Sequence, residues 1–114
     1  MWRRSLLLGL LVAGCSKGPQ EDLQYISQAR SLAAEWALVN EQAARHQLTG
    51  TYTRTMRESF REQLQTVSTS LTQPDSRYGQ EIRTLLVEPD EAAPAELRAH
   101  ADELKQIEDS LESA

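Results

Sequence analysis

Apolar side chains recur every three or four residues along most of this chain, the spacing that places them on one face of an α-helix. The first such stretch covers residues 22–48 and contains neither Pro nor Gly. Its apolar face is formed by Tyr25, Ala29, Leu32, Trp36, Val39, Ala43 and His46, with Ile26, Ala33, Ala37 and Ala44 beside them. We therefore expect a long first helix over residues 22–48.

A second apolar stripe predicts a helix over residues 51–71. The stripe consists of Tyr52, Met56, Phe60, Leu64, Val67 and Leu71. Gly50 is a natural end for the first helix, although apolar residues continue at spacings of four across it, as they would in one continuous helix. Extending the register of Trp36 and Ala43 by sevens reaches Gly50 and Arg57, which are not core residues. This favours a turn or a sharp kink at Gly50.

Two further helices are expected in the second half of the chain. Gln73-Pro74-Asp75-Ser76 marks a turn, and the apolar positions after it are Tyr78, Ile82, Leu85 and Leu86. Residues 87–93 form a predicted loop, and Pro94 suits the first turn of a last helix whose stripe is Leu97, Ala101, Leu104, Ile107 and Leu111. No stretch alternates as a strand does. The pattern predicts an all-α fold, a small antiparallel bundle of three or four helices.

The N-terminus follows a different pattern. Arg3 and Arg4 precede an uncharged, Leu-rich run from Ser5 to Gly14. A membrane-spanning helix needs about 20 apolar residues, so this run is too short to be a lasting anchor. It matches the apolar region of a secretory signal peptide.

The run ends in Val12-Ala13-Gly14-Cys15, which resembles the lipobox of bacterial lipoprotein precursors. The resemblance covers only the first 15 or 16 residues. It implies that the thiol of Cys15 becomes a diacylglyceryl thioether and that a signal peptidase cuts before it. The alternatives are an ordinary secretory signal cut elsewhere and a Cys in an N-terminal helix.

The resemblance divides the chain into a signal peptide (1–14), a flexible tether (15–21) and a helical domain (22–114). It implies a membrane partner reached through the lipid on Cys15. Ser16 resembles the signal for onward transport, which implies a cell-envelope protein on the outer membrane, facing the periplasm. Several acyl chains would anchor it without any spanning helix, at about 0.8 kcal/mol per buried CH₂.

Charge excludes some functions and leaves others open. The chain has 12 Lys+Arg against 17 Asp+Glu and a net charge of −5, which argues against nucleic acid as a partner. Residues 88–114 hold nine acidic side chains against Arg98 and Lys105. They form either an acidic surface for a basic partner or a solvated helix face. Arg54 and Arg61 are spaced for ion pairs with Glu58, and with Arg57 beside them they indicate a charged helix surface.

Signals for catalysis and metal binding are sparse. His46 and His100 lie 54 positions apart, and Glu96-Leu97-Arg98-Ala99-His100 lacks the Glu-x-x-His spacing of di-iron bundles. The single Cys excludes an intrachain disulfide. No nucleophile elbow or phosphate-binding loop is present in the sequence. We expect no enzyme, no cofactor and no metal site.

Two functional hypotheses remain. The first is a lipid-anchored structural or interaction protein that binds another envelope component or a second copy of itself. The second is a small-ligand or peptide-binding lipoprotein with a cavity among Trp36, Tyr52, Met56 and Phe60. Trp36 is either a core residue or the rim of such a groove, and Asn40, one turn later, is a candidate buried polar residue that fixes helix register.

Overall fold

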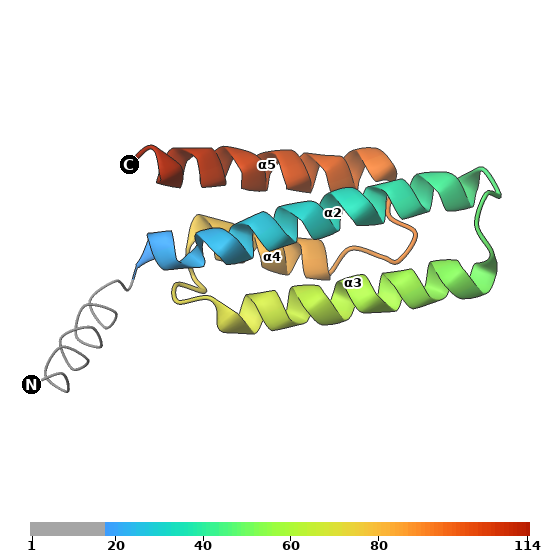
Figure 1. Ribbon diagram of the computed structural model, residues 1–114, viewed down its shortest axis with the longest axis horizontal. Helices are drawn as coiled ribbons and strands as arrows, with labels where there is room; N and C mark the ends of the chain where they lie inside the picture. The colour runs from blue at the N-terminus through green and yellow to red at the C-terminus, as the bar shows by residue number, and fades with distance from the viewer. Residues whose placement is uncertain (1–17) are drawn as a thin grey trace, which may run out of the picture.

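The computed structural model describes residues 18–114, which form four α-helices preceded by one turn of 3-10 helix (Figure 1). The elements are η1 (Pro19–Asp22), α2 (Leu23–Ala44), α3 (Gly50–Ser70), α4 (Arg77–Leu86) and α5 (Pro94–Glu112). Consecutive helices run in opposite directions, and α2 and α4 each pack between α3 and α5. The predicted all-α antiparallel bundle is confirmed, with four helices and no strand in residues 18–114.

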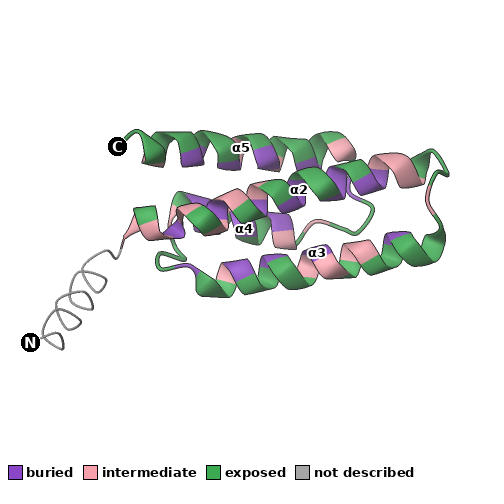
Figure 2. Ribbon diagram, viewed as in Figure 1, coloured by how far each residue is buried: buried purple, intermediate pink, exposed green. Residues whose placement is uncertain are grey.

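Most residues of the predicted apolar stripes face the interior of the bundle (Figure 2), but Ala44, His46 and Tyr52, which were expected on the apolar faces, are exposed. Burying a large apolar side chain contributes about 1.5–3 kcal/mol, so this core is the main source of stability. The largest completely buried apolar side chains are Trp36, Phe60, Ile26, Leu64, Ile82, Leu85, Leu97 and Leu104. The Trp36 side chain is therefore a core residue and not the rim of a groove.

The first helix ends earlier than predicted, at Ala44 and not at Leu48. His46 adopts a left-handed backbone conformation with φ of 60°. Its N–H donates to the Ala43 carbonyl at 3.0 Å, and the N–H of Gln47 donates to the Gln42 carbonyl at 3.0 Å. This is a Schellman cap with His in the position usually taken by Gly. The predicted turn between the helices is confirmed, but His46 makes it, and Gly50 is the first residue of α3.

The other helix starts follow from local sequence. The Thr49 hydroxyl accepts from the Tyr52 N–H at 3.1 Å, and the Ser76 hydroxyl accepts from the Gly79 N–H at 3.2 Å. These side chains cap α3 and α4. Gly79 is required by close packing, since a Cβ there would lie 2.2 Å from the carbonyl oxygen of Pro74.

A buried carboxylate fixes the place where the chain joins the bundle. Asp22 is completely buried, and its oxygens accept from the N–H groups of Thr72 at 2.9 Å and Gln73 at 3.2 Å. The Tyr78 hydroxyl donates to the same carboxylate at 2.6 Å. Burial, together with this hydrogen bond, raises the pKa of Tyr78 to about 12. Asp22 therefore joins η1 to the connection between α3 and α4.

The predicted tether over residues 15–21 overlaps this folded region, because Pro19 and the two residues after it already belong to η1. The predicted signal peptide, Cys15 and the part of the predicted tether before Gly18 lie outside the described residues. Among the described helices, none combines the length and the apolar character needed to cross a bilayer.

His46→Gly should stabilise the protein by about 0.5–1 kcal/mol, because the left-handed conformation strains every residue with a Cβ. Urea unfolding of the purified protein measures the difference. Gln47→Gly is the matched control, since Gln47 is also exposed but has no positive φ, and it should give no gain. A loss of stability in His46→Gly would contradict the role given to the Schellman cap.

Candidate functional site

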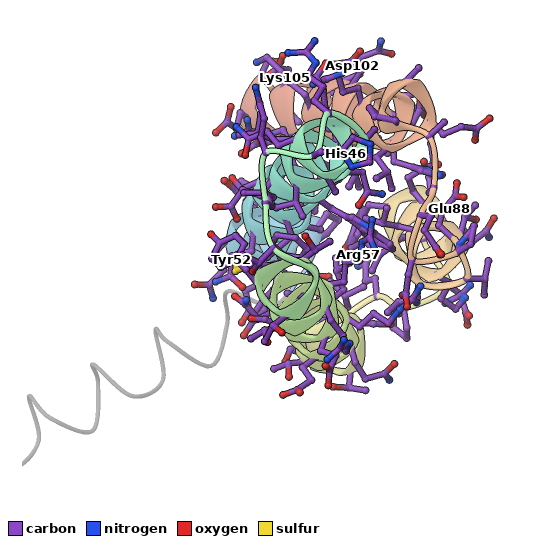
Figure 3. All side chains as sticks on the ribbon, turned by 90° about the vertical axis from the view of Figure 1, so that its right-hand side faces the viewer. His46, Tyr52, Arg57, Glu88, Asp102 and Lys105 are labelled. Carbon is purple, nitrogen blue, oxygen red and sulfur yellow. The ribbon has the colours of Figure 1, made fainter. Side chains whose placement is uncertain are left out.

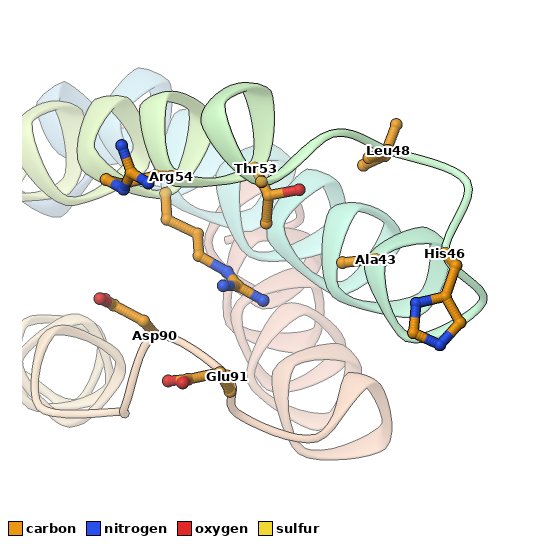
Figure 4. A pocket seen from close by; sticks show the side chains of 9 residues that line it. Ala43, His46, Leu48, Thr53, Arg54, Asp90 and Glu91 are labelled. Atoms are coloured by element: carbon orange, nitrogen blue, oxygen red, sulfur yellow. The ribbon is translucent and has the colours of Figure 1, made fainter.

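A cavity of about 550 Å³ lies at the end of the bundle where α2 turns into α3 (Figure 4). Its lining comes from the end of α2, the α2–α3 turn, the start of α3 and the α4–α5 connection: Ala43, His46, Leu48, Gly50, Thr53, Arg54, Arg57, Asp90 and Glu91. Asp90 and Glu91 approach from the side opposite α3 (Figure 4). The cavity therefore has cationic and anionic walls and suits a polar group better than an apolar ligand.

The α4–α5 connection that forms one wall is held by side chains of α2. The indole N–H of Trp36 and the side-chain amide of Asn40 both donate to the carbonyl of Asp90 at 3.0 Å. The Asn40 amide also donates to the carbonyl of Ala92 at 2.8 Å. Asn40 is 5% exposed, so the hypothesis of a buried polar residue is confirmed.

Two arginines of α3, Arg57 and Arg61, complete this network, which corrects their predicted placement on a solvated helix surface. The Arg57 guanidinium donates to the Asn40 side-chain oxygen at 2.9 Å, and Figure 3 shows Arg57 between the helices. The Arg61 guanidinium donates to the carbonyl of Leu86 at 2.8 Å and to the Asp90 carboxylate at 2.8 Å. It also lies 5.2 Å from the centre of the Trp36 ring, within cation–π range.

A second polar cluster surrounds His100 on α5. Its Nδ1 lies 2.5 Å from the Glu81 carboxylate and its Nε2 lies 2.7 Å from the Glu88 carboxylate. The His100 side chain is 11% exposed. Burial alone would lower the pKa of His100, but the hydrogen bonds and negative charges of Glu81 and Glu88 outweigh it and raise the pKa. Glu96 brings a third carboxylate to within 4.8 Å of the ligand atoms of Glu88 and His100.

The four residues predicted to share a ligand cavity are divided between the core and the surface. Trp36 and Phe60 are buried, Met56 is partly buried and Tyr52 is 50% exposed. The cavity at the α2–α3 end is lined by other residues. Cys15, the predicted lipidation site, lies outside the described residues.

Ion pairs connect charged residues of 88–114 to the rest of the bundle, and Glu103 and Glu108 supply part of the acidic charge used. They join α5 to α2 and α4, through Arg30–Glu108 at 2.9 Å, Arg98–Glu41 at 3.1 Å, and Arg77–Glu103. Glu108 is buried, whereas the other two pairs lie at the surface, where an ion pair contributes at most about 1 kcal/mol. The acidic residues therefore serve the packing of α5 as well as its solvation.

The sequence did not predict the His100 cluster, because Glu96 and His100 lack the Glu-x-x-His spacing of di-iron bundles and no further ligand lies near them in the chain. Glu96 and His100 are spaced i, i+4, so they share one face of α5, and this was the available signal. Glu81 and Glu88 reach His100 only through the packing of α4 and its connection against α5.

Comparison with known proteins gives no relative: no family model matches the chain, and neither a curated protein nor a solved structure matches it.

Asn40→Ala should destabilise the protein by about 2–3 kcal/mol, because it leaves the Ala92 carbonyl and the Arg57 guanidinium without their partner. Chemical denaturation measures the loss, and hydrogen exchange should show faster exchange in residues 87–93. Gln65→Ala, at an exposed position of α3, is the control. Equal stability of the two variants would contradict the role of Asn40 in holding the connection.

Proposed function

We propose that this chain is the precursor of a lipid-anchored protein of the bacterial cell envelope. The observation that carries the proposal is the order of features at the N-terminus: Arg3-Arg4, an apolar run, and Val12-Ala13-Gly14-Cys15. Modification of Cys15 with a diacylglyceryl group and removal of residues 1–14 would leave a mature protein held by its lipid. Two or more acyl chains are sufficient for stable anchoring.

The fold supports an interaction role for the anchored protein. Gly18, the first described residue, lies three positions after Cys15, so the bundle follows the lipid closely. The 22 residues of α2 span roughly 33 Å at the helical rise, and they lead away from this end. The cavity and the exposed Tyr52 are at the far end, which we propose as the contact with another envelope component or a second copy.

The proposed role includes no reaction. Cys15, the one thiol of the chain, is used by the lipid in this proposal. Arg57, one of the two arginines that line the cavity, donates to Asn40 and so serves the fold. Ser16 favours the outer membrane, facing the periplasm, as the location.

The anchor is tested by intact-mass analysis of the protein extracted from membranes. We expect a chain that begins at Cys15 and carries acyl mass, whereas Cys15→Ala should remain uncut because the lipid acceptor is lost. Ser16→Ala is the control and should be processed normally. An unmodified chain beginning at Met1 in the cytoplasm would remove the proposal.

The location is tested by separating inner and outer membranes on a density gradient. Ser16→Asp should keep its lipid and move to the inner membrane, because Asp at this position resembles a retention signal. Ser16→Thr should stay with the wild-type protein. An unchanged distribution of Ser16→Asp would contradict the proposed sorting but not the anchor.

The contact surface is tested with a photo-crosslinking residue placed at Tyr52 in living cells. We expect an adduct whose mass and peptides identify either a second copy or one envelope protein, because position 52 is exposed at the far end of the bundle. Thr69, exposed near the opposite end of α3, is the control position. The same adducts at both positions, or none at position 52, would count against this surface.

A further inference from the structure

The His100 cluster gathers more negative charge than its ion pairs neutralise. Glu81, Glu88 and Glu96 surround one imidazole. In residues 18–114, the ion pairs of Arg and Lys side chains involve other acids, and none involves these three glutamates. Three carboxylates gathered around one imidazole are a costly arrangement at a site that is partly shielded from water. A bound cation would compensate their charge.

The donor atoms point to a particular kind of cation. The ligand atoms of Glu88, Glu96 and His100 all lie within 4.8 Å of one another. A tetrahedral zinc ion has bonds of about 2.0–2.2 Å to carboxylate oxygen and imidazole nitrogen, so its ligand atoms lie about 3.4 Å apart. Small side-chain rotations reach that separation. A nitrogen donor favours zinc over calcium and magnesium, which prefer oxygen alone.

The surroundings of His100 match those of a metal ligand. Glu81 contacts Nδ1, and this leaves Nε2 directed at Glu88. A carboxylate on the second ring nitrogen is the usual partner of a metal-binding His, because it fixes the tautomer and the orientation of the ring. Glu96 is exposed, so the cluster is open to solvent on one side and an ion can reach it.

The backbone of the cluster is also fixed. Glu96 and His100 are one turn apart on α5, so the helix holds their spacing. Glu88 lies in the α4–α5 connection, and its carbonyl accepts a hydrogen bond from the Arg61 guanidinium. The network that holds the connection on Trp36 and Asn40 therefore also positions Glu88, which Figure 3 shows on the α4 side of the bundle.

We propose that Glu88, Glu96 and His100 bind a zinc ion, with Glu81 orienting His100 and water completing the coordination. The ion would join α5 to the α4–α5 connection. The site is independent of the lipid anchor, because all four residues belong to α4, α5 and the connection between them.

The test is titration of the purified, chelator-treated full-length protein with ZnCl₂ by calorimetry. We expect one zinc ion per chain. Glu96→Gln should weaken binding at least tenfold, and His100→Ala should abolish it. Asp102→Asn, which removes one exposed acidic charge from the same helix, should bind as the wild type does. Zinc should raise the melting temperature of the wild type and of Asp102→Asn, with little effect on Glu96→Gln.

The Glu96→Gln variant tests the zinc site even if His100→Ala fails to fold. Within the described residues, Glu96 has no side-chain hydrogen bond or ion pair, so this variant should keep its helical circular dichroism. If His100 serves only an ion pair with Glu81 and Glu88, zinc will not bind, or it will bind Glu96→Gln and Asp102→Asn equally. Either result would overturn the zinc site.

Discussion

The bundle depends on the pairing of a few buried polar groups at the α4–α5 connection. This segment crosses one end of the core, and its carbonyl groups would be costly there without partners. The Asp90 carbonyl accepts from Trp36 and Asn40 of α2, and Arg61 of α3 holds the start of the same segment. Since α5 packs mainly on α2, holding the connection on α2 also places the start of α5 beside that helix.

The spacing of apolar residues predicted the helices well, because a helix depends mainly on residues three and four positions apart in the sequence. The stripe from Tyr52 to Leu71 gave α3 to within one residue at each end, and Pro94 begins α5 as expected. The predicted end of α2 was wrong because Gly is a stronger sequence signal for the end of a helix than His. The structure uses His46 for the left-handed turn, a position that few residues with a Cβ adopt.

The spacing of residues along the chain could not predict the polar contacts, since these contacts join residues that are distant in the sequence. Arg61 and the Leu86 carbonyl are 25 positions apart, and Trp36 and Asp90 are 54 apart. The apolar stripes that contain Trp36 and Phe60 predict that both side chains are buried, which is correct, but they do not predict whether a cavity adjoins them. For the same reason, the sequence did not predict that Glu81 and Glu88 lie beside His100. It does predict that Glu96 lies beside His100, because the two residues are one helical turn apart.

The buried Asp22 carboxylate has a mechanical consequence. Tension on the chain before Gly18 would act first on η1, and η1 is joined through Asp22 to Thr72, Gln73 and Tyr78. The force would therefore be transmitted to the turn between α3 and α4. It would not first separate α2 from the helices packed against it. A protein tethered by its N-terminus could in this way withstand drag without unravelling from the tethered end.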